Sequence, residues 1–92
     1  MPPTRAHLFI EGRVQGVFYR AFTRNVAVKL GLRGWVRNLP DGRVEAVFSG
    51  DRSLIEQAVS ECRQGPFGSS VTHIELKWEY LPELPDGFEV RY

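Results

Sequence analysis

Residues 12–20 read Gly12-Arg13-Val14-Gln15-Gly16-Val17-Phe18-Tyr19-Arg20, a glycine-bearing connection between an apolar strand-like run and a helix-like run. A chain that enters a helix here presents unpaired backbone N–H groups and the positive end of the helix dipole, and both favour an anion. Gly12 and Gly16 permit turns that a Cβ would forbid. Arg20 adds a planar guanidinium that can bind two oxygens at once. The stretch predicts an oxyanion cradle, although from these residues alone a plain strand-to-helix connection fits equally well.

Hydrophobic periodicity on either side of this stretch predicts the other elements. They are a strand at 7–11, a helix at 20–30 ended by Gly31, strands at 34–39 and 43–48 joined by a turn at 40–42, a helix that a Ser53–Glu56 capping box opens and Gly65-Pro66 closes, a strand at 72–80 and a short edge strand at 88–92. Met1 to Arg5 is polar and contains proline, so it is expected to fray.

The order of these elements predicts an α+β fold of the ferredoxin-like, split βαβ type (βαββαβ plus a short C-terminal strand). Two helices would cover one face of a mostly antiparallel sheet. The first two strands should run parallel. The cradle after the first strand and Asn38, late in the second, are therefore expected at the same edge of the sheet.

Length and composition limit the class of protein. Ninety-two residues are expected to form a single domain, residues 1–92. Cys62 is the single cysteine and cannot form an internal disulfide, which favours a cytoplasmic setting. We expect no membrane insertion, because no signal peptide or membrane-spanning apolar run is present. A monomer is the default expectation. The formal net charge of +1 offers no field for nucleic acid, so none is expected as a partner.

Two segments resemble the signatures of the acylphosphatase family. The first is Gly12 to Arg20; the second is Gly34-Trp35-Val36-Arg37-Asn38 followed by Gly42-Arg43-Val44 and Gly50. They occur in the right order and with a compatible predicted topology. The sequence departs from the family pattern at Tyr19, where phenylalanine or methionine is expected. The additional hydroxyl needs a partner or solvent if the ring is buried.

The resemblance implies an enzyme that hydrolyses the carboxyl-phosphate bond of small acyl phosphates, releasing inorganic phosphate, with no metal or other cofactor. It implies that Asn38 orients the attacking water and that Arg20 binds the phosphate together with backbone amides. Those amides belong to Gln15, Gly16, Val17, Phe18 and Tyr19.

Simpler interpretations stand beside these roles. Without the resemblance, Asn38 fits a turn residue before Leu39-Pro40, and Arg20 fits a structural ion pair at a helix start. The Gln15 side chain fits a loop-stabilising role at least as well as a ligand contact. His7 and His73 are expected to face solvent on strands, because neither has the neighbours of a metal site.

Three other functions are open to this sequence. One is a carbamoyl-phosphate module like that at the start of larger hydrogenase-maturation proteins, although the cysteine-rich metal modules of such proteins are not found here. A second is a module that binds phosphate without turning it over, for which Asn38 would have no purpose. The third is an RNA binder. It is disfavoured because the predicted third strand presents Arg43, Glu45 and Val47 opposite its apolar side and no stacking ring.

Overall fold

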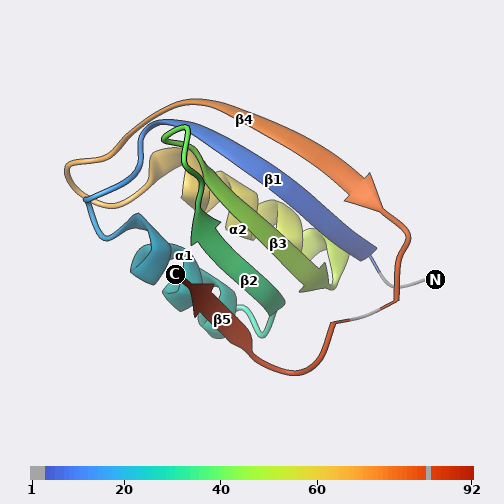
Figure 1. The fold of residues 1–92 in the computed structure, drawn as a ribbon. Helices are drawn as coiled ribbons and strands as arrows, with labels where there is room; N and C mark the ends of the chain where they lie inside the picture. Colours follow the sequence, from blue (N-terminus) through green and yellow to red (C-terminus); the bar gives the residue numbers. More distant parts are fainter. Residues whose placement is uncertain (1–3, 83) are drawn as a thin grey trace.

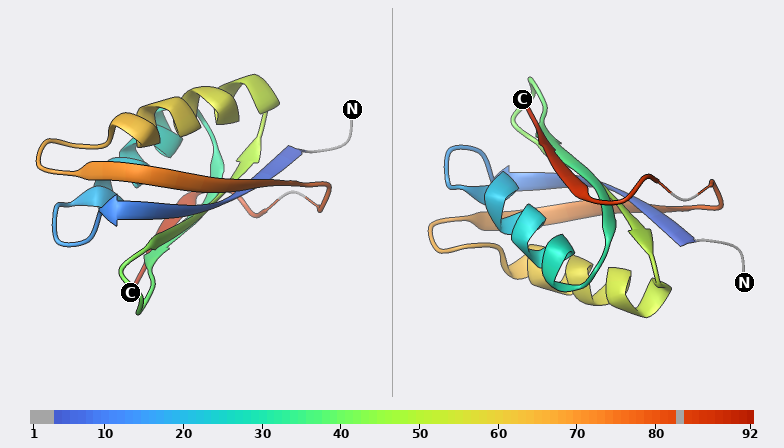
Figure 2. Two further views of the ribbon diagram at one scale, coloured as in Figure 1. Left: turned by 90° about the horizontal axis from the view of Figure 1, so that it is seen from above. Right: turned by 90° about the horizontal axis from the view of Figure 1, so that it is seen from below.

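The structure is a computed structural model that describes residues 4–82 and 84–92. A five-stranded sheet forms one layer, and two helices cover one of its faces (Figures 1 and 2). The elements are β1 (Thr4–Arg13), α1 (Tyr19–Lys29), β2 (Arg33–Asn38), β3 (Val44–Gly50), α2 (Arg52–Gln64), β4 (Ser70–Glu79) and β5 (Phe88–Arg91). The order in the sheet is β4-β1-β3-β2-β5, and only the β2–β5 pair is parallel. The predicted ferredoxin-like plan with an added C-terminal strand is confirmed.

Strands β1 and β2 lie on either side of β3 and run in the same direction. Both pair antiparallel with β3, and Ile10 of β1 and Asn38 of β2 have the same partner in register, Val44. The loop after β1 and the end of β2 therefore meet at one edge of the sheet, as the sequence predicted. This placement decides which residues can share a site.

The core lies between the helices and the inward face of the sheet. Alternate residues of β1 and β3 point toward the helices because successive side chains of a strand face opposite sides. The fully buried residues of this layer include Ala6, Leu8, Ile10, Val36, Val44, Ala46, Phe48, Ile55 and Ala58. Burial of these apolar side chains holds the helices against the sheet. Each of the larger ones stabilises the folded state by about 1.5–3 kcal/mol relative to an exposed side chain.

The ends of the helices follow local rules, with one correction to the sequence prediction. Helix α1 ends in a Schellman motif: Leu32 N–H donates to the Ala27 carbonyl at 2.8 Å, and Gly31 N–H donates to Val28 at 3.1 Å. For α2 the predicted Ser53–Glu56 capping box is wrong. Asp51 is the N-cap, since its carboxylate accepts from Ser53 N–H at 2.9 Å. A carboxylate at this position also interacts favourably with the positive end of the helix dipole.

Strand β1 is longer than predicted. Thr4 and Arg5, expected to fray, pair with Gly50 and Ser49 of β3. Met1 to Pro3 lie outside the described residues. The strand pairs because its backbone has partners on both sides; side-chain polarity alone does not reveal them.

Two glycines shape the exit from β1. Gly12 lies at a shift in register between β1 and β4 with φ +124°, and a Cβ there would lie 2.0 Å from the Ser70 carbonyl oxygen. Gly16 has φ +73°. A side chain at position 12 would force the strands apart, and one at position 16 would be strained. Gly16 therefore lies at a bend of the loop as expected, whereas Gly12 lies at an irregularity within β1 and not in a turn.

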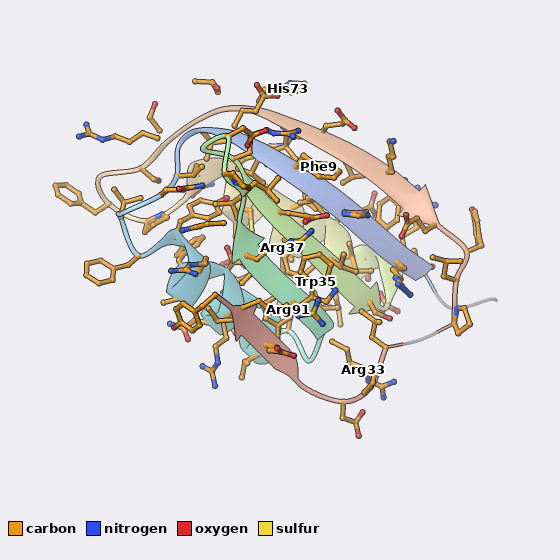
Figure 3. The ribbon with its side chains drawn as sticks, viewed as in Figure 1. Phe9, Arg33, Trp35, Arg37, His73 and Arg91 are labelled. Atoms are coloured by element: carbon orange, nitrogen blue, oxygen red, sulfur yellow. The ribbon has the colours of Figure 1, made fainter. Side chains whose placement is uncertain are left out.

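The face of the sheet turned away from the helices carries aromatic and arginine side chains (Figure 3). The Arg37 and Arg91 guanidinium carbons lie 5.3 and 4.6 Å from the Trp35 ring centroid, and that of Arg43 lies 5.0 Å from the Phe9 ring. The expectation that the third strand itself supplies no ring holds, but the neighbouring strands place rings over it. Glu45 is therefore buried, not solvated.

Candidate active site

The loop after β1 is the stretch from which the sequence predicts an oxyanion cradle, and we refer to it as the cradle. It leads into α1 through Phe18, the N-cap, whose backbone is left-handed (φ 58°, ψ 26°). Within the described part of the chain we find no hydrogen bond donated by the backbone amides of residues 15–19. Amides without partners at a helix N-terminus are the arrangement that binds a phosphate group.

Arg20 lies in the first turn of α1 and has no carboxylate partner among the described residues. Its Nη1 donates to the Arg91 carbonyl at 3.0 Å, and its guanidinium carbon lies 4.5 Å from the Tyr92 ring centroid. A neutral carbonyl and a ring hold the side chain without cancelling its charge. The remaining guanidinium donors are available for an anion. The structural ion pair considered from sequence is therefore not what holds Arg20.

Asn38 is the last residue of β2, and its amide oxygen is buried. Among the described residues this Oδ1 has no hydrogen-bond partner. A buried acceptor without a partner is unfavourable by about 1–3 kcal/mol, so such groups in folded proteins call for an explanation. A water molecule or a ligand that donates to Oδ1 would satisfy it.

A pocket of about 610 Å³ brings these groups together. Arg20 and Asn38 both line it, and so do Gly16, Phe18 and Tyr19 of the cradle. The other lining residues, which the sequence reasoning did not name as site residues, are Val14, Ala21, Arg24, Asn25, Val90 and Tyr92. Five of the seven predicted site residues therefore lie on one pocket.

The side chains of Gln15 and Val17 do not line that pocket. Gln15 Nε2 donates to the Leu39 carbonyl at 2.8 Å and to the Arg43 carbonyl at 2.9 Å, which ties the cradle loop to the β2–β3 turn. Val17 packs against the core. The structure supports the loop-stabilising interpretation of the Gln15 side chain. The predicted role of the Gln15 and Val17 backbone amides does not depend on where these side chains lie.

The hydroxyl of Tyr19 has the hydrogen-bond partner that a buried tyrosine needs. Its ring is buried, and its hydroxyl donates to the Cys62 carbonyl at 2.6 Å. Burial raises the pKa of the Tyr19 hydroxyl well above its usual value, so the group stays protonated and remains a donor. The departure from the family pattern thus joins the first turn of α1 to the last turn of α2.

Strand β5 and the residue after it line the pocket, although the sequence analysis named no site residue there. Val90 and Tyr92 line the pocket, and the Arg91 carbonyl accepts from Arg20. Because β5 runs parallel to β2, with Arg37 opposite Arg91, its far end lies beside Asn38. The signal was the short apolar pattern at 88–92, but its position next to β2 cannot be read from local sequence.

No three His, Cys, Asp or Glu side chains among the described residues lie close enough together to hold a metal ion. Neither described helix has the length and apolar character needed to cross a membrane.

Comparison with known proteins gives one consistent result. The family model Acylphosphatase matches residues 6–90. An acylphosphatase of Haloarcula marismortui is 54% identical over the full length of both chains. The crystal structure of acylphosphatase from Bacillus subtilis superposes with a TM-score of 0.94 at 34% identity, covering 97% of this chain and 99% of that one. A structure of full-length HypF gives a TM-score of 0.86 at 26% identity, but the match covers only 12% of that protein. The chain belongs to the acylphosphatase family.

Proposed function

We propose that Arg20 and the backbone amides of residues 15–19 bind the phosphate of an acyl phosphate, and that Asn38 positions the water that attacks it. Hydrolysis of acyl phosphates is the activity of the family to which the chain belongs. The observation that carries the proposed roles is the buried Asn38 Oδ1, which has no partner among the described residues and lies in the same pocket as Arg20. No carboxylate of residues 4–82 and 84–92 pairs with Arg20.

Hydrolysis of an acyl phosphate requires that the water be positioned for attack and that the charge of the transition state be stabilised. The water oxygen attacks phosphorus, the bond between phosphorus and the acyl oxygen breaks, and the carboxylate leaves with that electron pair. Hydrogen-bond donors of Arg20 and the cradle stabilise the negative charge that develops on the phosphoryl oxygens in the transition state. A carboxylate is a good leaving group and needs no strong general acid.

The proton of the water has a route that does not require a general base. Asn38 Oδ1 can accept a hydrogen bond from the water and so orient the water molecule. A neutral amide cannot take the proton itself. We assign the proton to a non-bridging oxygen of the phosphoryl group. The products are then the carboxylate and inorganic phosphate, and no step requires a metal.

Hydrolysis of benzoyl phosphate in the presence of EDTA tests the assignment. Arg20→Ala should lower kcat/KM at least about a hundredfold, by analogy with loss of one preorganised donor to a developing oxyanion. Asn38→Ala should lower kcat while competitive inhibition by inorganic phosphate is nearly unchanged. Arg63→Ala, which alters an exposed arginine of α2 away from the pocket, is the matched control.

The results that would contradict each role differ. Near-normal kcat/KM in Arg20→Ala would remove Arg20 from phosphate binding. A pure loss of phosphate affinity in Asn38→Ala would argue against water positioning. Activity that EDTA abolishes would refute the metal-free mechanism.

We infer that residues 1–92 act as one domain, because one continuous core runs from Ala6 to Phe88. We also propose that the protein acts as a monomer. Small acyl phosphates and inorganic phosphate are the proposed partners, with no nucleic acid. The arginines of the open sheet face already pair with carboxylates, as Arg37 does with Glu45 and Arg91 with Glu89. A single buried free thiol, Cys62, is compatible with the cytoplasm.

A further inference from the structure

The pocket extends beyond the groups that the phosphate needs. Arg20, Asn38 and the cradle amides account for the phosphate and the water. Part of the remaining lining is apolar and comes from three places: Phe18 before α1, Ala21 within it, and the C-terminal segment, with Val90 in β5 and Tyr92 after it. An acyl phosphate held by its phosphate must place its acyl group against some of this lining.

Phe18 is the most unusual residue of the pocket. It is the single non-glycine residue at positive φ in the described part of the chain, and its side chain is 86% exposed. The left-handed conformation is unfavourable for an aromatic residue, whereas glycine adopts it without strain. An exposed ring also gains nothing from burial. Packing within this chain therefore does not account for a ring at this position.

Tyr92 is the second exposed aromatic residue on the same pocket. It is fully exposed, and its ring faces the guanidinium of Arg20 at 4.5 Å. The group that binds the phosphate thus lies directly against an aromatic surface. The acyl carbon is one bond from the bridging oxygen, so an acyl group leaves the phosphate site within reach of these rings.

We propose that Phe18 and Tyr92 form an acyl-binding wall that favours acyl phosphates with an aromatic or extended apolar acyl group over those with a methyl group. The inference rests on the proposed function, because the phosphate must be held by Arg20 and the cradle for the acyl group to reach the wall. Aromatic rings stack on rings of a ligand in offset or edge-on arrangements, which adds binding beyond the area that they cover.

The test compares kcat/KM for benzoyl phosphate with kcat/KM for acetyl phosphate in each variant. Both substrates carry the same phosphate, so a disturbance of the cradle affects both and cancels in the ratio. Phe18→Asn removes the ring and keeps a residue that tolerates the left-handed backbone. We expect it to lower the benzoyl-to-acetyl ratio about fivefold, the usual size of one aromatic pair. Tyr92→Ala should lower the ratio in the same direction.

Two further variants separate the ring from general effects. Phe18→Tyr retains the ring and should restore the ratio of the unaltered protein. Phe67→Asn removes an equally exposed phenylalanine that does not line the pocket, and should leave the ratio unchanged. An unchanged ratio in both Phe18→Asn and Tyr92→Ala would overturn the acyl-binding wall while leaving the hydrolase intact. Failure of the unaltered protein to hydrolyse either substrate would overturn the proposed function as well.

Discussion

The hydroxyl of Tyr19 supplies a hydrogen bond that the end of α2 lacks. The Cys62 carbonyl lies in the last turn of that helix, and the residue four positions later is Pro66, which has no N–H to donate. Tyr19 donates to this carbonyl instead, at 2.6 Å. At the scale of a single residue, the Tyr19 hydroxyl therefore supplies the donor that the buried Cys62 carbonyl lacks. The same hydrogen bond ties the start of α1 to the end of α2.

We expect Tyr19→Phe to lower the free energy of unfolding by about 1–3 kcal/mol, because it leaves the Cys62 carbonyl buried without a donor. Urea denaturation followed by circular dichroism measures the change. Tyr80→Phe, which alters an exposed tyrosine, is the control and should have little effect. Equal stability of the Tyr19→Phe variant and the unaltered protein would show that the hydrogen bond contributes nothing net.

The sequence identified the need of the Tyr19 hydroxyl but not the group that meets it. Arg20 and Asn38 could be named as candidates because their chemistry is specific and the resemblance covers both, and the structure places both on one pocket. The partner of Tyr19 is a backbone carbonyl 43 residues away, and a carbonyl carries no residue-specific signal. The same limit applies to Gln15, whose side chain donates to two backbone carbonyls.

At the scale of elements, β5 completes the lining of the candidate site. It has four residues, yet the Arg91 carbonyl orients Arg20 and the chain that follows supplies a pocket ring. Figure 1 shows the C-terminal end of β5 beside α1. An arginine held from a neighbouring strand keeps its guanidinium in place without a competing carboxylate.

Removing residues 91 and 92 should therefore weaken phosphate binding and lower kcat/KM by at least about tenfold, since a displaced positioning group can reduce rate by up to a hundredfold. Inhibition by inorganic phosphate and benzoyl phosphate kinetics measure both effects. Arg91→Ala is the control, because it keeps the backbone carbonyl that accepts from Arg20. Normal phosphate inhibition after the deletion would mean that Arg20 is oriented by α1 alone.

The elements themselves were mostly predictable, because each carries a clear period of apolar residues. The errors concern the ends. Asp51 caps α2, although Ser53 and Glu56 have capping-box spacing, since both candidates stand within three residues and only the backbone geometry selects one. Thr4 and Arg5 join β1 because β3 and β4 extend far enough to pair with them. Long-range pairing overrides local composition in both the extent of β1 and the position of β5.

At the scale of the whole molecule, Glu45 joins the three central strands on the open face of the sheet. It lies on β3 and is 5% exposed; His7 of β1 donates from Nε2 at 2.6 Å, and Arg37 of β2 donates from Nε at 2.6 Å. Burial by itself raises the pKa of the carboxyl, but the hydrogen bonds from His7 and Arg37 outweigh it and hold the pKa below its usual value.

This network predicts how stability depends on pH. A carboxyl whose pKa is lower in the folded protein stabilises the fold above its unfolded pKa of about 4.3, and that contribution is lost as the pH falls through the folded pKa. Glu45→Gln should therefore lower the free energy of unfolding by about 1–3 kcal/mol at pH 7. Its difference from the unaltered protein should shrink below about pH 4. Glu89→Gln, which alters an exposed carboxylate 3.5 Å from Arg91, should be nearly neutral throughout. A Glu45→Gln deficit that persists unchanged at low pH would assign the effect to packing instead of charge.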